Sequence, residues 1–291
     1  MITDRMKPYT YEQLRDYSAL FSRAEALAWQ KGSFYSLNQK INRHDKAWLS
    51  EKKCSYSDYL KYIYRILESH YPTEYIIKNS FLNESLIPEL KKSEATIFNE
   101  FRVGESVGDL AIFNGISKVF EIKTEFDSDA RLKLQLENYK RIFSEVYLIV
   151  PESKLGYYKK VDTSIGLILY DTSKKKKFFL ERNSNFNTNI DLCAIMNILH
   201  TNEYKSIIID YYGEVPKMTS FNQFEKSKKL IVEIPIIDFN KLFIKYMKKR
   251  VMSTELSSRN FKELNQLALA LKLGRREKLN LIGNLKTSLI S

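Results

Sequence analysis

The chain has 291 residues, 44 % of them hydrophobic, with a mean hydropathy of −0.37 and a net charge of +12 at neutral pH. These values predict a soluble globular protein, and they exclude a membrane-spanning class because no run of about 18 apolar residues is present. Two unpatterned cysteines and a start without a secretory signal argue against a disulfide-rich secreted protein, so we expect a cytoplasmic one.

The first part of the chain is predicted to be helical. Apolar residues recur at helical spacing in 9–50 and again around 59–67, where Pro72 ends the second helix. A third helix is expected over 74–86. We therefore expect an N-terminal helical segment, 1–73, followed by a mixed α/β core over 74–185 and a basic helical region over 186–291.

The stretch "VGDLAIFNGISKVFEIKT" alternates as a β-hairpin with its turn at Asn114-Gly115. A two-residue loop would place Asp109 opposite Phe120. A three-residue loop instead sets Asp109 directly opposite Glu121, with both side chains on one face. Gly115 can supply the left-handed backbone that the longer loop needs.

Two carboxylates held this close would repel each other, and burying them in a sheet is costly. Mg²⁺, with Mn²⁺ as a substitute, removes that cost because it takes carboxylate, water and phosphate oxygens as ligands. Lys123 follows on the same face as Asp109 and Glu121. It would orient or deprotonate a water, or neutralise charge on a phosphorane-like transition state, which is the chemistry of phosphodiester hydrolysis. The alternative interpretation is an ion-paired edge on an exposed sheet face.

A helix is expected to begin after Asp127 or Ser128, which are good capping residues, and to bury Leu132, Leu136 and Tyr139. A strand over 146–150 follows it. This strand–helix–strand order predicts a crossover between two parallel strands.

The remainder is predicted to contain one more hairpin and then helices. The hairpin joins 165–170 to 178–180 through a lysine-rich turn, and helices are expected over 190–211, 220–232, 237–250, 257–272 and 275–289. Residues 241–291 carry 12 Lys and Arg against 3 Asp and Glu, a net charge of +9, which favours a polyanionic partner. Within them, 261–285 suits either a packed helical hairpin, which we favour, or a helix-turn-helix with Arg275, Arg276 and Lys278 at the bases.

The segments "GDLAIF", "VFEIKTE", "RLKLQLENY" and "EVYLIV" together resemble the PD-(D/E)XK nuclease superfamily, to which many restriction endonucleases and Holliday-junction resolvases belong. More narrowly they are similar to a bacterial branch with the core G-D…E-I-K…Q-L-x-x-Y. The resemblance covers about 74–150. It implies a restriction-endonuclease-like central sheet with flanking helices, and an endonuclease rather than an exonuclease.

The resemblance also implies roles for particular residues. The first acid corresponds to Asp109, and the E-x-K element corresponds to Glu121, Ile122 and Lys123. The Ile122 carbonyl would then be a further metal ligand. Gly108 stands where some members have proline.

The remaining positions implied by the resemblance lie on helices. Gln135 corresponds to the helical glutamine next to the substrate backbone, and Arg131 stands on the same flank. A helical glutamate before the first strand is best matched by Glu84, with Glu100 as the alternative fourth group. Both remain open from the sequence.

We therefore expect a Mg²⁺-dependent nuclease acting on nucleic acid, with DNA favoured over RNA and without membrane association. Two alternatives come from other classes: a nucleic-acid-binding regulatory or defence protein on the same fold without cleavage, and a protein-interaction module. A second copy of the chain or another protein is also a candidate partner.

Overall fold

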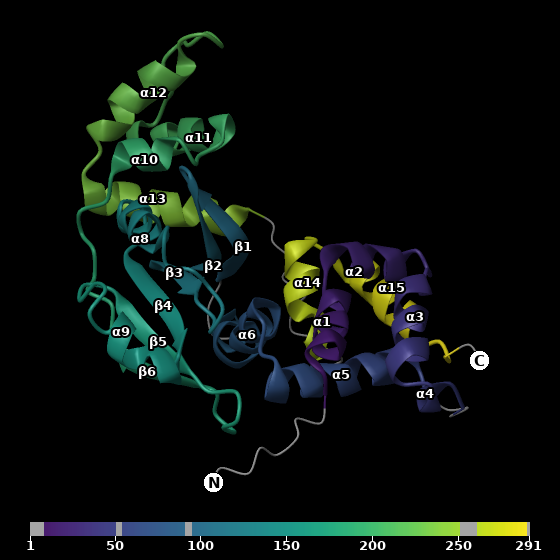
Figure 1. Ribbon diagram of the computed structural model, residues 1–291. Helices are drawn as coiled ribbons and strands as arrows, with labels where there is room; N and C mark the ends of the chain where they lie inside the picture. Colours follow the sequence, from purple (N-terminus) through teal and green to yellow (C-terminus); the bar gives the residue numbers. More distant parts are fainter. Residues whose placement is uncertain (1–8, 51–53, 91–94, 251–260, 290–291) are drawn as a thin grey trace. The chain divides into compact units, whose positions relative to one another are not determined.

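The computed structural model describes residues 9–50, 54–90, 95–250 and 261–289 (Figure 1). The chain divides into two compact units, each described by itself. The sheet unit comprises Ser85–Asp171 and Lys176–Met252. The helical unit comprises Met1–Glu84, Thr172–Lys175 and Ser253–Ser291. The helical unit is therefore built from both ends of the sequence.

The helical unit begins with short helices whose starts are marked by capping residues. Ser55 caps the longest of them, α5, because its hydroxyl accepts from the Asp58 N–H and the Asp58 carboxylate accepts from the Ser55 N–H. This helix ends at His70, shortly before Pro72. The bounds in this unit are α1 Tyr11–Leu20, α2 Arg23–Gln30, α3 Tyr35–His44, α4 Ala47–Ser50, α5 Tyr56–His70, α6 Glu74–Phe81, α14 Asn265–Ala270 and α15 Arg275–Leu285.

A buried polar network fixes the C-terminal helices of this unit. Asn265 donates to Asn83 Oδ1 at 2.6 Å and accepts from Lys278 Nζ at 2.7 Å. Asn79 accepts from the Gln266 N–H at 2.9 Å. Lys278 is only 4 % exposed, so it faces the protein interior. Lys278 is therefore not placed for the base contact that the helix-turn-helix interpretation gave it.

The sheet unit is built on a six-stranded mixed sheet in the order β1-β2-β3-β4-β5-β6 (Figure 1). The first three strands are antiparallel, β3, β4 and β5 are parallel, and β6 returns antiparallel to β5. The mixed α/β fold expected from the sequence is confirmed. The bounds are β1 Thr96–Val103, β2 Ser106–Phe113, β3 Ser117–Ile122, β4 Glu145–Pro151, β5 Gly166–Tyr170 and β6 Phe178–Arg182.

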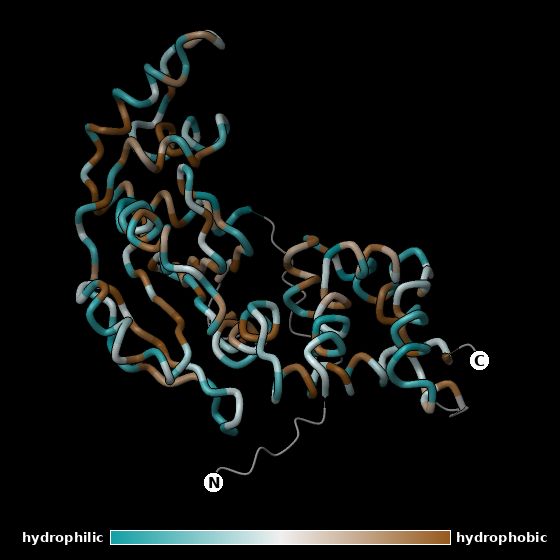
Figure 2. Tube along the Cα trace, in the orientation of Figure 1, coloured by the Kyte–Doolittle hydropathy of each residue, from teal (hydrophilic) through white to brown (hydrophobic). Residues whose placement is uncertain are grey.

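Helices of the sheet unit cover one face of the sheet. Alternating residues of the strands, such as Ala111, Phe113, Val119 and Leu148, form one apolar core with α8, α10, α11, α12 and α13. Figure 2 shows this apolar character as brown segments along the strands. The bounds are α7 Ile87–Leu90, α8 Leu132–Lys140, α9 Leu155–Tyr158, α10 Leu192–Met196, α11 Thr201–Tyr212, α12 Gln223–Val232 and α13 Ile236–Lys249.

The parallel crossover predicted from the sequence is present as β3–α8–β4, in which Glu121 pairs with Leu148. However, α8 begins at Leu132, later than expected. Asp127 does not cap it, because its carboxylate accepts from the Thr124 N–H at 2.6 Å. The carboxylate of Asp129 is likewise engaged by the Tyr158 hydroxyl at 2.8 Å. Both acids thus belong to the loop.

The division into two units differs from the three consecutive segments expected from the sequence. Residues 186–250 pack against the sheet, since Phe243 and Met247 of α13 are fully buried in its core. Residues 261–289 join the helical unit instead, where Tyr75 donates to the Glu263 carbonyl at 2.5 Å. The predicted basic region 241–291 is therefore shared between the two units. Within the described residues, no helix has the length and apolar character needed to cross a bilayer.

Candidate active site

The turn between β2 and β3 places Asp109 level with Glu121. Pairing runs from Phe113 with Ser117 to Leu110 with Phe120, which is the register of a three-residue loop. Gly115 has φ = 107°, so the expected left-handed position is confirmed.

Beyond the Leu110–Phe120 pair, the carboxylate of Asp109 replaces a backbone acceptor. Its Oδ2 accepts from the Ile122 N–H at 2.8 Å. The N–H and C=O of an extended residue point to the same side of a strand, so the Ile122 carbonyl is also directed toward β2. A carboxylate and a carbonyl therefore converge at the end of this ladder.

Gly108 has a steric role beside the site. A Cβ atom at this position would lie 2.5 Å from Cγ2 of Val119 and 3.6 Å from Cζ of Tyr139. Only glycine lets β2 approach β3 and α8 this closely. The glycine in front of Asp109 is therefore required by packing.

Glu121 is the centre of a hydrogen-bonded cluster between β3 and α8. Its Oε1 accepts from Lys123 Nζ at 3.0 Å and from Gln135 Nε2 at 2.8 Å, and its Oε2 accepts from the Tyr139 hydroxyl at 2.8 Å. Lys123 Nζ also donates to Gln135 Oε1 at 3.1 Å. The predicted residues Glu121, Lys123 and Gln135 thus lie together.

This cluster is almost completely removed from water. Glu121 is 4 % exposed and Lys123 is 7 % exposed. Burial, with a further contribution from the charge of Asp109, raises the pKa of Glu121 to about 7, while Lys123 and Tyr139 oppose that rise. Burial and the charge of Glu121 raise the pKa of Tyr139, which keeps its hydroxyl protonated as a donor. Glu121 can therefore gain or lose a proton near neutral pH.

The donor set suits a hard divalent cation. Asp109 and Glu121 offer carboxylate oxygens from neighbouring strands, and the Ile122 carbonyl is directed to the same side. Mg²⁺ is commonly held by one or two carboxylates, with waters or phosphate oxygens completing its octahedron. In the described parts of the chain, no three Asp, Glu, His or Cys side chains gather in the manner of a metal site. A cation here would rest on two carboxylates.

The two candidates for a further acidic ligand lie in different places. Glu100 is level with Asp109 in the β1–β2 register, where Asn99 pairs with Leu110 and Phe101 with Gly108. Its backbone has φ = 55° and its side chain is exposed. Glu84 lies in a π-helical turn, Leu82–Leu86, and belongs to the helical unit.

Arg131, which precedes α8, and Tyr139 of α8 differ in their relation to the cluster. Arg131, expected beside Gln135, is exposed and stands just before the first helical residue. Tyr139, expected only as a core residue, contacts Glu121 directly. The spacing from Gln135 to Tyr139 is one helical turn, so both project toward the same strand. This four-residue spacing in the sequence could have indicated that Tyr139 joins Gln135 at Glu121.

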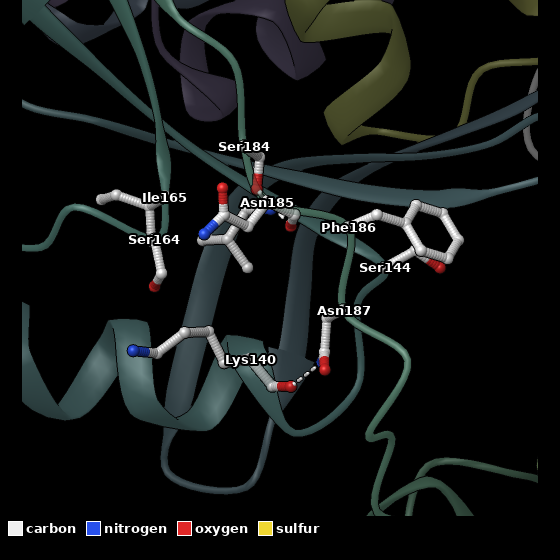
Figure 3. A pocket seen from close by; sticks show the side chains of 9 residues that line it. Lys140, Ser144, Ser164, Ile165, Ser184, Asn185, Phe186 and Asn187 are labelled. Carbon is white, nitrogen blue, oxygen red and sulfur yellow. Dashed lines mark hydrogen bonds between the residues drawn. The ribbon is translucent and has the colours of Figure 1, made fainter.

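A separate cavity of about 210 Å³ lies at the other edge of the parallel strands (Figure 3). Ser144 directly precedes β4 and Ile165 directly precedes β5, and 184–187 after β6 complete the lining together with Lys140 of α8. Lys140 Nζ is paired with Asp162 Oδ2 at 2.7 Å. The residues that line this cavity carry no carboxylate. The carboxylates of the candidate active site lie at the opposite edge, at the end of β3.

Comparison with known proteins assigns the chain to a family. A model of the family described as "Bacteriophage P4 protein cII" matches residues 68–271, more than half of the sequence. The chain belongs to the bacteriophage P4 protein cII family.

Protein cII of Enterobacteria phage P4 is 29 % identical to this chain over 123 residues. The aligned part covers 41 % of this chain and 47 % of that protein, so the chain spans about half the length of the curated relative it matches. The span matched by the cII family contains the whole β2–β3–α8 cluster, including Asp109, Glu121, Lys123 and Gln135.

One solved structure is also similar, the SPO1766 protein of unknown function from Silicibacter pomeroyi. It is 12 % identical, with a TM-score of 0.31, and the similarity covers 48 % of this chain and 94 % of that one.

Proposed function

We propose that this protein is a Mg²⁺-dependent nuclease that hydrolyses phosphodiester bonds, with DNA as its favoured substrate and endonucleolytic cleavage as its favoured mode. The proposal rests on one observation: Glu121 is buried against Lys123 and Gln135 at the end of a strand, with Asp109 beside it. The resemblance of these segments to PD-(D/E)XK nucleases agrees with this arrangement. A cytoplasmic setting is part of the same proposal, because neither Cys54 nor Cys193 forms a disulfide.

Stability alone does not explain a buried charged cluster, because an ion pair removed from water seldom gives a net gain in the free energy of unfolding. Lys123 and Glu121 would be replaced at little cost by apolar residues if only the fold mattered. Their presence beside Asp109, at the carboxyl end of a parallel strand where ligands bind in α/β sheets, supports a catalytic role.

The roles of the side chains follow from their contacts. Bound Mg²⁺ would polarise the phosphate and lower the pKa of a water. Asp109 and Glu121 would hold it, with the Ile122 carbonyl alongside. Lys123 would release its hydrogen bond to Glu121 and donate to the oxygen on which charge develops. Hydrolysis forms one P–O bond to water and breaks the P–O bond to the departing sugar oxygen.

Two residues of α8 would position this machinery. Gln135 accepts from Lys123 Nζ and donates to Glu121, so it fixes the distance between the ammonium and the carboxylate. Tyr139 holds the second oxygen of Glu121. Both act through other residues and are positioning residues in this proposal.

The test is a cleavage assay with closed circular DNA, linear duplex, single-stranded DNA and RNA, with and without Mg²⁺ or Mn²⁺. Circular DNA is cut only by an endonuclease, since it has no ends. We expect metal-dependent cleavage that is lost in Asp109→Asn and Lys123→Met. Glu137→Gln is the matched control, because Glu137 lies on α8 but is exposed. Full activity of Asp109→Asn or Lys123→Met would contradict the proposal.

A second candidate is a nucleic-acid-binding protein that does not cleave, which the net charge of +12 favours. It predicts binding that weakens steeply with salt and no product with any substrate or metal. The third candidate, a protein-interaction module, predicts neither cleavage nor salt-dependent binding of nucleic acid.

A further inference from the structure

Two exposed aromatic rings lie on the segments that follow neighbouring parallel strands, Phe126 on a loop and Tyr157 on the short helix α9. Phe126 follows β3 and is 69 % exposed, and Tyr157 follows β4 and is 57 % exposed. The carboxyl ends of parallel strands lie at the same edge of a sheet, so both segments share the edge at which Lys123 follows β3. The rings are therefore on the side of the candidate active site.

The loop after β3 is held in one conformation by its own hydrogen bonds. The Thr124 N–H donates to Asp127 Oδ2 at 2.6 Å, and the Phe126 N–H donates to Thr124 Oγ1 at 3.1 Å. These bonds form a tight turn with Phe126 at its tip. A ring presented by a fixed turn loses little conformational freedom when it binds a ligand.

The loop after β3 and the helical segment after β4 are also bonded to each other on both sides of the exposed rings. Before them, Lys154 Nζ donates to the Glu125 carbonyl at 2.8 Å and the Ser153 hydroxyl donates to the Glu125 carboxylate. After them, the Tyr158 hydroxyl donates to Asp129 Oδ1 at 2.8 Å. Phe126 lies between Glu125 and Asp129 in the sequence. The two rings therefore belong to one surface that these hydrogen bonds hold together.

The charges around the rings indicate which part of a nucleotide they would meet. Glu125, Asp127 and Asp129 lie on the loop that carries Phe126, and such acids repel phosphate, whereas Lys154, Lys159 and Lys160 flank Tyr157 and attract it. A nucleic acid strand would therefore turn its bases toward Phe126 and could place its backbone beside the lysines. Nucleobases present flat faces on which aromatic side chains stack.

We infer that Phe126 and Tyr157 form a stacking surface for unpaired bases next to the scissile phosphate, and that the preferred substrate is single-stranded or locally unpaired nucleic acid. This inference rests on the proposed nuclease function. Phe126 is three residues from Lys123, a span of at most about 11 Å. At about 3.4 Å per nucleotide, the stacked bases lie within roughly three nucleotides of the phosphate bound beside Lys123. Bases inside a duplex hide their faces from such rings.

The first experiment measures dissociation constants of the full chain in EDTA, which prevents metal-dependent cleavage. The ligands are a single-stranded oligonucleotide, its duplex, and a single strand in which the bases are replaced by abasic sites. The variants are Phe126→Leu and Tyr157→Leu. The matched control is Phe221→Leu, because Phe221 is 97 % exposed and lies beside α12. All three sites are on the surface, so the fold is expected to persist.

Stacking on one aromatic ring strengthens binding by a factor of about 5 to about 150. We expect Phe126→Leu and Tyr157→Leu to weaken binding of the base-containing single strand by such factors. Binding of the duplex and the abasic strand, and all binding by Phe221→Leu, should be unchanged. As a second readout, the fluorescence of Phe126→Trp should be quenched by the base-containing strand and not by the abasic one.

Unchanged single-strand affinity in both leucine variants would overturn the inference, as would equal losses for duplex and single strand. Absence of any nucleic-acid binding would overturn it too and would favour a protein partner for these rings. The two proposals fail separately. Base-dependent binding without cleavage would end the nuclease proposal alone, and cleavage that is indifferent to the leucine substitutions would end the stacking inference alone.

Discussion

The hydroxyl of Tyr139 donates a hydrogen bond of 2.8 Å to Oε2 of Glu121, although neither residue is exposed by more than 4 %. A buried carboxylate without this donor would keep only the partners on its other oxygen. Tyr139→Phe should therefore lower the free energy of unfolding at pH 8 by about 1–3 kcal/mol. Denaturation by urea measures the change.

The control for this substitution is Tyr158→Phe. Tyr158 is also fully buried, but its acceptor Asp129 is partly exposed and can bind water instead. Tyr158→Phe should therefore lower the free energy of unfolding by less than Tyr139→Phe does. Equal stability of Tyr139→Phe and the wild type would contradict the importance of the Glu121 contact.

The elevated pKa of Glu121 makes the stability of the metal-free protein depend on pH. Its folded value is about 7 against 4.5 in a model peptide, so between these values the folded state keeps a proton that the unfolded chain has released. Stability contributed by this group is complete below about pH 4.5 and is lost as the pH rises to 7, a fall of about 3 kcal/mol. Glu121→Gln should remove this fall. The measurement is the difference in unfolding free energy between wild type and variant across pH 4–8, and a constant difference would refute it.

Divalent cations should reverse the destabilisation at high pH. At a concentration of one hundred times the dissociation constant, Mg²⁺ or Mn²⁺ should raise the unfolding free energy by about 2.7 kcal/mol at pH 8. Asp109→Asn and Glu121→Gln should abolish this gain, and Glu137→Gln should keep it. Thermal unfolding with and without cation gives the answer, with Na⁺ at equal ionic strength as a further control. The same gain in Asp109→Asn would place the cation elsewhere.

A side chain at Gly108 should disturb the site through packing. The added methyl of Gly108→Ala would lie 2.5 Å from Val119 Cγ2, which predicts a destabilisation of about 1–3 kcal/mol. The double variant Gly108→Ala/Val119→Ala removes the opposing methyls. If the clash is the cause, the second substitution should cost much less in the Gly108→Ala background than in the wild type. Additive losses would argue against a direct clash.

Binding of nucleic acid can be tested at the basic start of α15. Arg275 and Arg276 are exposed, and glutamates at the first turn of a helix are favourable, so Arg275→Glu/Arg276→Glu should fold. We expect weaker DNA binding and a slope of affinity against salt reduced by about two. An unchanged slope would show that these arginines contact no phosphate.

Another basic cluster within 241–291, formed by Lys248, Lys249 and Arg250, is less suited to this test. Arg250 donates to both carboxylate oxygens of Glu203 at 2.6 Å and is largely buried. Reversing its charge would leave two acids in contact and would destabilise α13 whether or not DNA is bound. Lys249 is exposed and lies over the ring of Tyr246.

The sequence was sufficient for the features set by short-range pattern. The alternation of β2 and β3 and the glycine at 115 predicted the hairpin register, because a shift of one residue would have exposed one apolar face. The crossover to β4 followed from the apolar spacing of 132–139. The grouping of Glu121, Lys123 and Gln135 was predicted from the register together with the resemblance to known nucleases.

Features set by distant partners were not predictable in this way. Asp127 was expected to cap α8, yet its carboxylate accepts from the nearby Thr124 N–H, and Tyr158, 29 residues away, holds the neighbouring Asp129 in the loop. Tyr139 has the spacing of a core residue, and only the position of β3 turns its hydroxyl into a ligand of Glu121. The pairing of 261–289 with the first helices depends on contacts between residues far apart in sequence, which no local pattern encodes.

The helical unit is closed by a bridge between Ser55 and Ser288 and by a hydrogen bond from the Leu289 N–H to the Cys54 carbonyl at 3.1 Å. Residues 85–250 are thus inserted between the two parts of the helical unit. The first part is translated before the sheet unit, and the second part is translated after it. The ribosome releases the complete sheet sequence before the residues that finish the helical core exist. The apolar surface of the first helices therefore stays exposed to water until residues 261–289 leave the ribosome and pack against it. A premature stop near 260 would leave a folded sheet attached to an exposed, aggregation-prone set of helices.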